Sequence, residues 1–554
     1  MARFFLSPRV VQFLLASCLS NVVLAGSTSG APTLTLDYGT FQGTSTGNLT
    51  LFLGMPFARA PVDELRFAPP QPPLSLEGVQ NASAYGPACP QSLQDDIEGG
   101  GSSTIDENCL SVNVIKPSDI LDGTKLPVLF WIFGGGFTTG SASSHPGNPI
   151  VERSIALGEP VIHVSANYRL NAFGFLPGEE VLEAGIANAG IRDQRFALEW
   201  VHENIDKFGG DPSKVVLWGG SAGSMSVATQ ITLNDGDTQG LYRGAVMHSG
   251  TSFHAKLDVK EAQPYYDSIV NITGCSEASD TLSCLRNVSM EAIVEAVEQL
   301  PSPRSYTSLN TVWSPRTDGQ LIKSDPVPIL KQGLYAKVPI ITGDVDDEGT
   351  LFSLAQTNIT TNEQFLDFVE SNYLTGISEE ELQAIGEAYP EDPSQGSPFG
   401  TGNAYAITPE YKRLAAFQGD LVFQAPRRFL LQILSQTQDT WSYLYKRGKN
   451  NTAIIGTSHG SDIPYFYGAN TTDFLGTDAI INFANTLNPM LPENPISLLT
   501  SSGLTWDCYG SSVDSPPLLT FIDPAPEATI TSDTYRNDGI GLLNKIAAEL
   551  QGSG

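Results

Sequence analysis

The stretch Lys214-Val215-Val216-Leu217-Trp218-Gly219-Gly220-Ser221-Ala222-Gly223-Ser224 indicates most about this chain. Its first half is an apolar run typical of a buried strand, and a helix-forming stretch follows from Met225. Between them stands Gly-x-Ser-x-Gly, whose small residues let the strand and the start of the helix approach closely. A strand, a sharp turn and a helix in this order strain the backbone and expose the serine hydroxyl above a sheet. We therefore predict that Ser221 is a nucleophile.

The five-residue pattern alone is weak evidence, because it occurs at 43–47, 219–223 and 456–460. Only the middle copy has a hydrophobic strand before it and a helix after it. The first copy lies among Thr, Ser and Asn residues, which is typical of a polar turn. The third copy contains His459 in a loop. The surroundings, rather than the pattern, single out Ser221.

Apolar runs that alternate with helical patterns predict the fold class. These runs are Leu110–Ile115, Leu126–Phe133, Val161–Ser165, Val215–Trp218, Gly244–His248, Val338–Thr342 and Trp441–Tyr445. A helical segment, Asp193–Val201, lies between two of them and is followed by a Gly-Gly-Asp-Pro stop signal. Runs that are apolar throughout suit strands covered by helices on both faces. We expect an α/β fold with a large, mostly parallel sheet and long helical excursions at Lys256–Thr311 and Asn358–Arg427.

Residues 1–25 predict a secretory signal peptide. Arg3 and Arg9 precede an apolar stretch, and a small-residue cleavage site stands near Ala25. Polar residues interrupt this stretch, so it is too short and too polar for a membrane anchor. No composition break divides residues 26–554. We therefore expect a single domain that is secreted and extracellular.

Composition and net charge disfavour several classes of binding partner. The formal net charge of −30 repels nucleic acid and anionic membranes. With 41% hydrophobic and 16% charged residues, the chain is globular rather than disordered. We expect no nucleic acid partner, no stable membrane anchor, no metal ion and no cofactor. The sequence does not indicate an oligomeric state.

Acceptor sequences for N-glycosylation agree with export. The pattern Asn-x-Ser/Thr occurs at Asn48, Asn81, Asn271, Asn287, Asn358, Asn450 and Asn470. Removal of the leader leaves five cysteines, whose spacing suggests two local pairs and one unpaired residue. They are Cys89, Cys109, Cys275, Cys284 and Cys508.

A serine nucleophile needs an imidazole base that a carboxylate holds in place. Five of the six histidines are less suitable, because they lie in apolar strands, in an amphipathic helix or in loops without a motif. They are His145, His163, His202, His248 and His254. His459 remains, in a loop after the predicted strand Trp441–Tyr445. We therefore predict His459 as the base.

The chain order nucleophile, acid, base places the acid between Ser221 and His459, at the end of a strand. The stretch Ile340–Thr350 fits this position, and it leaves four candidates open. They are Asp344, Asp346, Asp347 and Glu348.

Backbone donors are needed to stabilise the oxyanion of a tetrahedral intermediate. The predicted strand Leu126–Phe133 ends in three glycines, whose bare backbone lets N–H groups face a substrate. We expect these donors at Gly135 and Gly136, with a third at Ala222 directly after the nucleophile.

With these features the chain resembles the type-B carboxylesterase/lipase family, to which cholinesterases also belong. The shared motifs cover most of the sequence after the leader. They are Phe52–Ala58, Leu65–Phe67, Glu107–Val114, Asn167–Leu170, Phe173–Leu176, Asp193–Arg195, Asn204–Ile205 and Gly210–Pro212. The resemblance implies the α/β-hydrolase fold, carboxylic ester hydrolysis, Glu348 as the acid and His459 as the base. It also implies a Cys89–Cys109 pair and a Cys275–Cys284 pair.

Two positions depart from the family. Gly220 stands where the family usually has Glu, so a buried carboxylate near His459 is missing, which should alter the tuning of the base. Phe133 stands where the family often has His before the three glycines. Since the oxyanion donors belong to the main chain, we expect little effect from Phe133.

The flap between Cys89 and Cys109 bears on the substrate. It is short, acidic and glycine-rich and offers no apolar face to a lipid surface. It also lacks Trp, the best ring for a quaternary ammonium, so choline esters are disfavoured. We expect soluble short- to medium-chain esters as substrates. The alternatives are a true triacylglycerol or sterol-ester lipase and, in another class, a catalytically idle binding or adhesion protein.

Overall fold

The computed structural model describes residues 30–91, 104–121, 123–251, 258–491 and 494–552. The predicted signal peptide, His254 and most of the flap between Cys89 and Cys109 lie outside the described residues.

An eleven-stranded sheet runs through the centre of the chain. Its strands, in spatial order, are β14 (Ala528–Ser532), β13 (Pro517–Phe521), β12 (Thr440–Tyr445), β11 (Ile340–Val345), β10 (Gly244–His248), β9 (Gly210–Gly220), β7 (Leu126–Ile132), β8 (Ile162–Ala166), β6 (Ser111–Pro117), β4 (Leu49–Pro56) and β3 (Thr44–Thr46). The strands from β13 to β8 pair in parallel, and both edges of the sheet are antiparallel. A separate small sheet contains β1 (Thr33–Leu36), β2 (Gly39–Gln42) and β5 (Val79–Asn81).

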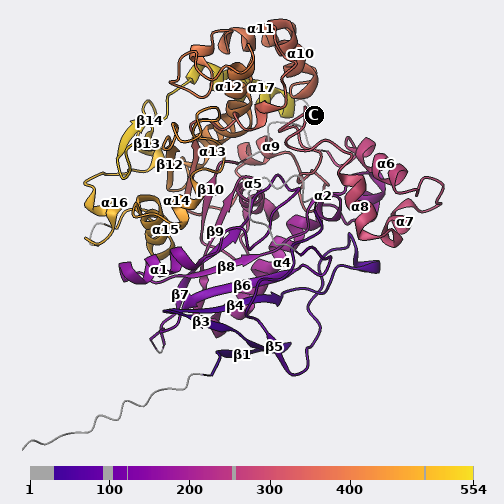
Figure 1. Cartoon of the computed structure of the whole chain (residues 1–554), viewed down its shortest axis with the longest axis vertical. Helices are drawn as coiled ribbons and strands as arrows, with labels where there is room; N and C mark the ends of the chain where they lie inside the picture. Colours follow the sequence, from indigo (N-terminus) through magenta and orange to yellow (C-terminus); the bar gives the residue numbers. More distant parts are fainter. Residues whose placement is uncertain (1–29, 92–103, 122, 252–257, 492–493, 553–554) are drawn as a thin grey trace, which may run out of the picture.

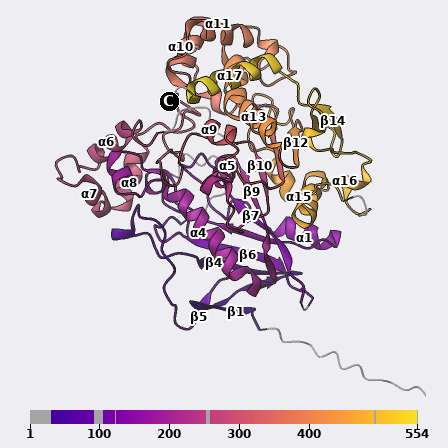
Figure 2. The ribbon, with the colours of Figure 1, turned by 180° about the vertical axis from the view of Figure 1, so that it is seen from behind.

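Helices surround the central sheet (Figures 1 and 2). They are α1 (Asn148–Leu157), α2 (Asn171–Phe175), α3 (Glu179–Glu183), α4 (Ala189–Asn204), α5 (Ala222–Gln230), α6 (Gln263–Ile272), α7 (Thr281–Asn287), α8 (Met290–Val297), α9 (Pro326–Lys331), α10 (Asn362–Asn372), α11 (Glu379–Ala388), α12 (Tyr411–Gly419), α13 (Ala425–Leu434), α14 (Ile463–Tyr467), α15 (Leu475–Thr486), α16 (Leu498–Ser501) and α17 (Asn537–Gly552). A π-helical turn, Asp420–Gln424, joins α12 to α13. Helices α10, α11 and α17 gather at the end opposite β1 and β5 (Figure 1).

The main hydrophobic core lies between the sheet and its helices. A second buried cluster lies among α10, α11, α12 and α17. This second cluster accounts for the longer of the two helical excursions, because these helices bury their apolar faces against one another.

The expected α/β fold is confirmed, with differences at the edges of the sheet. All seven expected strands are present, with ends shifted by a few residues, and Asp193–Val201 lies inside α4. The antiparallel strands β3, β4 and β14 and the parallel strand β13 were not predicted. The expectation of a polar turn at 43–47 is wrong for Thr44–Thr46, which forms β3 by pairing with β4.

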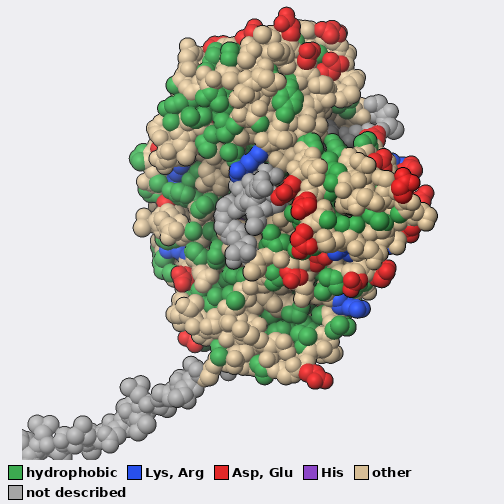
Figure 3. Space-filling view, turned by 45° about the vertical axis from the view of Figure 1, so that its right-hand side comes forward, with side chains coloured by type: hydrophobic (Ala, Val, Ile, Leu, Met, Phe, Trp, Pro, Cys, Tyr) green, Lys and Arg blue, Asp and Glu red, His purple; other side chains and the backbone are tan. Residues whose placement is uncertain are grey.

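Acidic residues dominate the exposed charge. On the face in Figure 3, Asp and Glu side chains greatly outnumber Lys and Arg, in keeping with the net charge of −30. The seven acceptor asparagines are all exposed. No helix of the described residues is long and apolar enough to cross a membrane.

Two disulfides are present, Cys89–Cys109 and Cys275–Cys284, as the resemblance implied. Among the described cysteines, Cys508 is free, and burial raises the pKa of its thiol to about 11. A thiol with so high a pKa is a poor nucleophile, so Cys508 should exchange slowly with these disulfides.

We predict that the double substitution Cys275→Ser and Cys284→Ser lowers the free energy of unfolding by about 3 kcal/mol or less, because the bond closes a short loop. Denaturant unfolding measures this, and Cys508→Ser is the matched control with little change. Peptide mapping without reduction that joined Cys508 to any of the other four cysteines would contradict this framework.

Candidate active site

Ser221 lies at the sharp turn between β9 and α5. Its backbone has φ 54° and ψ −124°, a left-handed conformation that is strained for a residue with a side chain. The N–H of Ser221 donates to the carbonyl of His248 at the end of β10, at 2.8 Å. The turn is therefore secured from the neighbouring strand, and it projects the hydroxyl beyond the carboxyl edge of the sheet.

The glycines around Ser221 are required by close backbone contacts. A Cβ at Gly223 would lie 2.0 Å from the carbonyl oxygen of Ile132, and one at Gly219 would lie 2.3 Å from that of Gly223. No side chain fits at either distance. The three atoms nearest to a Cβ at Gly220 instead all belong to side chains, the closest being Ile463 Cδ1 at 2.9 Å. The first and last glycines of the motif are therefore structural, whereas Gly220 is not under the same constraint.

His459 contacts Ser221 and Glu348 with its two ring nitrogens. Its Nε2 lies 2.8 Å from Ser221 Oγ, and its Nδ1 lies 2.6 Å from Glu348 Oε2. An ionised carboxylate only accepts hydrogen bonds, so Nδ1 carries the proton and Nε2 is left to accept from the hydroxyl. The rings of Phe423 and Phe352 pack against the imidazole, with centroids at 4.6 and 5.1 Å. These contacts fix the orientation of the ring.

The other three acidic candidates are engaged elsewhere. Asp344 lies 2.7 Å from Arg427 and Asp346 lies 2.5 Å from Lys449. Asp347 accepts N–H bonds from Thr457 at 2.9 Å and Phe399 at 2.8 Å. Asp347 therefore holds the loop that carries His459, and of the four acidic candidates it is Glu348 that contacts the imidazole.

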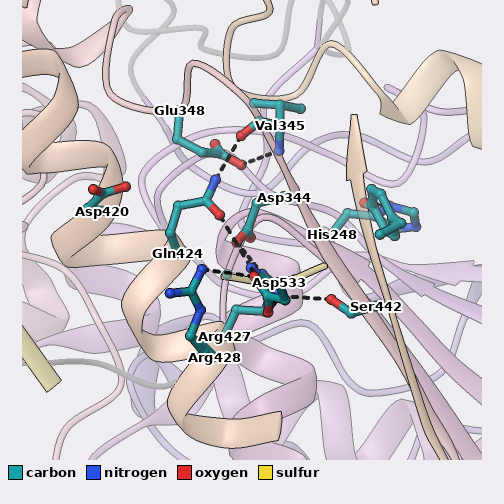
Figure 4. A network of polar contacts seen from close by, with 12 residues as sticks. His248, Asp344, Val345, Glu348, Asp420, Gln424, Arg427, Arg428, Ser442 and Asp533 are labelled. Carbon is teal, nitrogen blue, oxygen red and sulfur yellow. Dashed lines mark hydrogen bonds and ion pairs between the residues drawn. The ribbon is translucent and has the colours of Figure 1, made fainter. Parts of the chain in front are cut away.

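A buried network supports Glu348 from below (Figure 4). Glu348 Oε1 accepts the N–H of Val345 at 2.8 Å, and the carbonyl of Val345 accepts from Gln424 Nε2 at 2.8 Å. Gln424 ends the π-helical turn that also presents Phe423 to His459. Such turns insert an extra residue and re-aim side chains, often at functional sites. The turn thus supports both the base and the carboxylate.

Arg427 occupies the centre of this network, between two aspartates. It donates to Asp533 at 2.8 Å and to Asp344 at 2.7 Å, and all three side chains are fully buried. Burial by itself would raise the pKa of Asp533, but the charges and hydrogen bonds of Arg427 and Arg428 hold this pKa well below its usual range. Burial raises the pKa of Asp344 to about 7, despite Arg427. Among the described residues, Asp344 Oδ1 has no hydrogen-bond partner, so Arg427 does not fully satisfy this carboxylate.

Two of the three expected oxyanion donors, Gly135 and Gly136, follow β7. Gly135 and Gly136 have φ of 97° and 63°, which favours glycine. Gly136 and Ala222 line the same cavity as Ser221. Phe133 stacks on Tyr168 at 4.4 Å, and the Tyr168 hydroxyl donates to the Phe133 carbonyl at 2.8 Å. Phe133 therefore anchors the end of β7 in the core.

Two cavities meet at Ser221. One, of about 50 Å³, is mostly apolar and is also lined by Gly136 and Ala222. Its apolar lining includes Phe137, Met225, Leu309, Phe352, Val422 and Phe423. The other, of about 210 Å³, contains His459, Gly220 and several hydroxyl and imidazole groups. The site can thus hold one group on the oxyanion side and another beside the base.

The remaining described histidines do not contact Ser221 Oγ. Burial lowers the pKa of His145 to about 4 and that of His163 to about 3, so both are uncharged at neutral pH. His248 is fully buried and lies against the larger cavity. Its side-chain contacts were missed by the sequence reasoning, because the partners come from distant strands.

Comparison with known proteins agrees with this geometry. A family model described as "Carboxylesterase family" matches residues 30–487. The chain belongs to this family. Lipase 2 of Diutina rugosa is 39% identical over 95% of this chain and 98% of its own length. The secreted triacylglycerol lipase LIP1 of Gibberella zeae is 38% identical over 94% and 91%.

Solved structures of esterases are similar to this chain in fold. The structure of Aspergillus niger EstA is similar with a TM-score of 0.80, at 28% identity, over 94% of this chain and 99% of that one. A structure titled PNB esterase has a TM-score of 0.74 at 27% identity, over 93% and 100%. The family and the relatives named as lipases and esterases make the chain a carboxylic ester hydrolase.

For this carboxylesterase we predict that Gly223→Ala destabilises the fold by about 3 kcal/mol or more, because the added carbon overlaps a main-chain carbonyl. Gly220→Ala is the matched control and should cost about 1 kcal/mol or less, since Ile463 can shift. Denaturant unfolding of both variants measures the difference. Equal destabilisation of the two would refute the contacts described for the turn.

Proposed function

We propose that the chain hydrolyses carboxylic esters through an acyl-enzyme on Ser221, with His459 as the base and Glu348 as the acid. The observation that carries this is the unbroken contact line from Ser221 Oγ through His459 to Glu348, at 2.8 and 2.6 Å. Nucleophile, base and carboxylate in this order define the serine hydrolase arrangement.

The reaction proceeds in two halves. His459 Nε2 takes the hydroxyl proton as Ser221 Oγ attacks the ester carbonyl carbon. The N–H groups of Gly135, Gly136 and Ala222 stabilise the oxyanion. The imidazolium, held by Glu348, then gives its proton to the departing alkoxide, which leaves as the alcohol. Water repeats the sequence on the acyl-enzyme and releases the carboxylic acid.

The two cavities suggest where the parts of the substrate bind. The acyl chain suits the apolar cavity, because its carbonyl oxygen would then lie beside Gly136 and Ala222. The alcohol suits the larger cavity, because His459 must protonate it there. We propose soluble short- to medium-chain esters as the substrates, as the composition of the flap between Cys89 and Cys109 predicts.

A triacylglycerol lipase is the second candidate. The names of the relatives favour it, since one is a secreted triacylglycerol lipase. Most of the flap whose composition disfavours a lipase, residues 92–103, lies outside the described residues. Droplet-dependent activity distinguishes the two candidates.

We also propose that the protein is secreted, that residues 26–554 form one domain and that the chain is N-glycosylated. Relatives named as secreted lipases support export, as does the predicted leader. The seven acceptor asparagines are exposed, and glycan attachment needs exposure. Mass analysis of secreted protein, before and after removal of N-glycans, tests these assignments.

Replacement of Ser221 by Ala should lower kcat by about 10⁴- to 10⁶-fold without a loss of stability, because nucleophile and base act as a unit. Hydrolysis of a soluble butyrate ester measures it, with thermal unfolding as the check on folding. Activity above a thousandth of the parent enzyme would mean that another residue is the nucleophile.

The substitution Glu348→Gln should reduce kcat by about 10³- to 10⁴-fold, since the neutral amide cannot stabilise the imidazolium. The matched control is Asp346→Asn, which removes a nearby carboxylate that pairs with Lys449 instead. A larger loss in the control would transfer the role of acid away from Glu348.

Hydrolysis of short-chain esters should follow simple saturation below the solubility limit, with no jump as droplets form. Long-chain triglyceride should be a poor substrate. This is tested by measuring the rate for one ester at concentrations below and above its solubility limit, because the bond cleaved and the acyl group then stay the same. A sharp rise at that limit, or a preference for long-chain triglyceride, would assign the chain to the lipases.

A further inference from the structure

Four fully buried polar side chains lie beside the nucleophile and have no part in the proposed reaction. They are Trp218, His248, Tyr443 and Asp462. The first three come from β9, β10 and β12, and Asp462 follows His459 by three residues. Three strands and the loop of the base therefore meet in one cluster.

Hydrogen bonds fix the protons in this cluster. Trp218 Nε1 is only a donor and lies 2.7 Å from His248 Nε2, so Nε2 accepts. The proton of the neutral ring is therefore on Nδ1, which lies 2.5 Å from Tyr443 Oη. Tyr443 in turn donates to Asp462 Oδ2 at 2.6 Å.

The charge of the cluster is on Asp462. Burial opposes ionisation of Asp462, yet hydrogen bonds from His248 and Tyr443 hold its pKa below the usual value. Burial and the neighbouring Asp462 raise the pKa of Tyr443 well above its usual value, so its hydroxyl keeps the proton. A buried carboxylate held by two donors has one orientation, which suits a fixed support.

His248 also contacts the nucleophile through its main chain. Its carbonyl accepts the N–H of Ser221 at 2.8 Å. Asp462 is joined to His459 by a tight turn, in which Ser461 N–H donates to Ser458 at 3.0 Å and Ile463 N–H donates to Gly460 at 3.3 Å. One residue thus holds the serine by its backbone and the loop of the base by its ring.

We propose that His248 is a positioning residue that sets the relative position of Ser221 and His459. Its backbone holds the turn of the nucleophile, and its Nδ1–H holds Asp462, and hence the His459 loop, through Tyr443. The inference rests on the proposed function, since it concerns the geometry of that reaction.

Two substitutions of His248 separate its contacts. The side-chain amide of Asn can place an N–H donor at the position of Nδ1, which faces Tyr443. The longer side chain of Gln instead places its amide at the position of Nε2, which faces Trp218. With a soluble butyrate ester, His248→Gln should lower kcat by about 10- to 100-fold with KM little changed, because misplacement impairs the chemical step. His248→Asn should restore most of that kcat, because it can still donate towards Tyr443 and Asp462.

The outcomes are distinct. Equal kcat losses in the two folded variants, or an unchanged kcat in His248→Gln, would overturn the proposal. If His248→Gln fails to fold, Asp462→Asn replaces it: a lower kcat with unchanged KM supports the proposal, and an unchanged kcat overturns it. Failure of the proposed function is recognised separately, because the parent enzyme would then lack activity or Ser221→Ala would retain it.

Discussion

The rest of the site depends on the close contact of main chain at the turn between β9 and α5, where Gly223 packs against the end of β7. The main chain at Gly219 and Gly223 is so close to other main chain that a single added carbon would overlap a carbonyl oxygen. This contact forces Ser221 into its left-handed conformation and directs its hydroxyl away from the sheet. Since adjacent parallel strands end at the same edge, the loops after β11 and β12 then bring Glu348 and His459 to the hydroxyl.

The second requirement is a rigid support for the imidazole and its carboxylate. It comes from a segment distant in sequence from both residues: Phe423 packs on His459, and Gln424 donates to the carbonyl of Val345, whose N–H donates to Glu348. Below them, Arg427 and Asp533 form a buried ion pair that needs all its partners, because an unpaired buried charge is costly.

Local pattern predicted the parts of the site that are contiguous in sequence. Strand, glycine turn and helix identified Ser221, and chain order with elimination reached His459. Pattern left Asp344, Asp346, Asp347 and Glu348 equivalent, because their distinction depends on Arg427, Lys449 and the His459 loop. The antiparallel edge strands were missed, since short strands such as β3 are defined by pairing rather than by composition. The cluster around His248 was also missed, because its members come from three strands and a loop that lie far apart in sequence.

The most direct measurement is to trap the acyl-enzyme. The enzyme is mixed with a slowly deacylating ester, quenched in acid within the first turnover, digested and analysed by mass spectrometry. The account predicts one acyl group, located on the peptide that contains Ser221 and on that residue. An acyl group on another side chain, or complete turnover with no acylated peptide at any quench time, would contradict it.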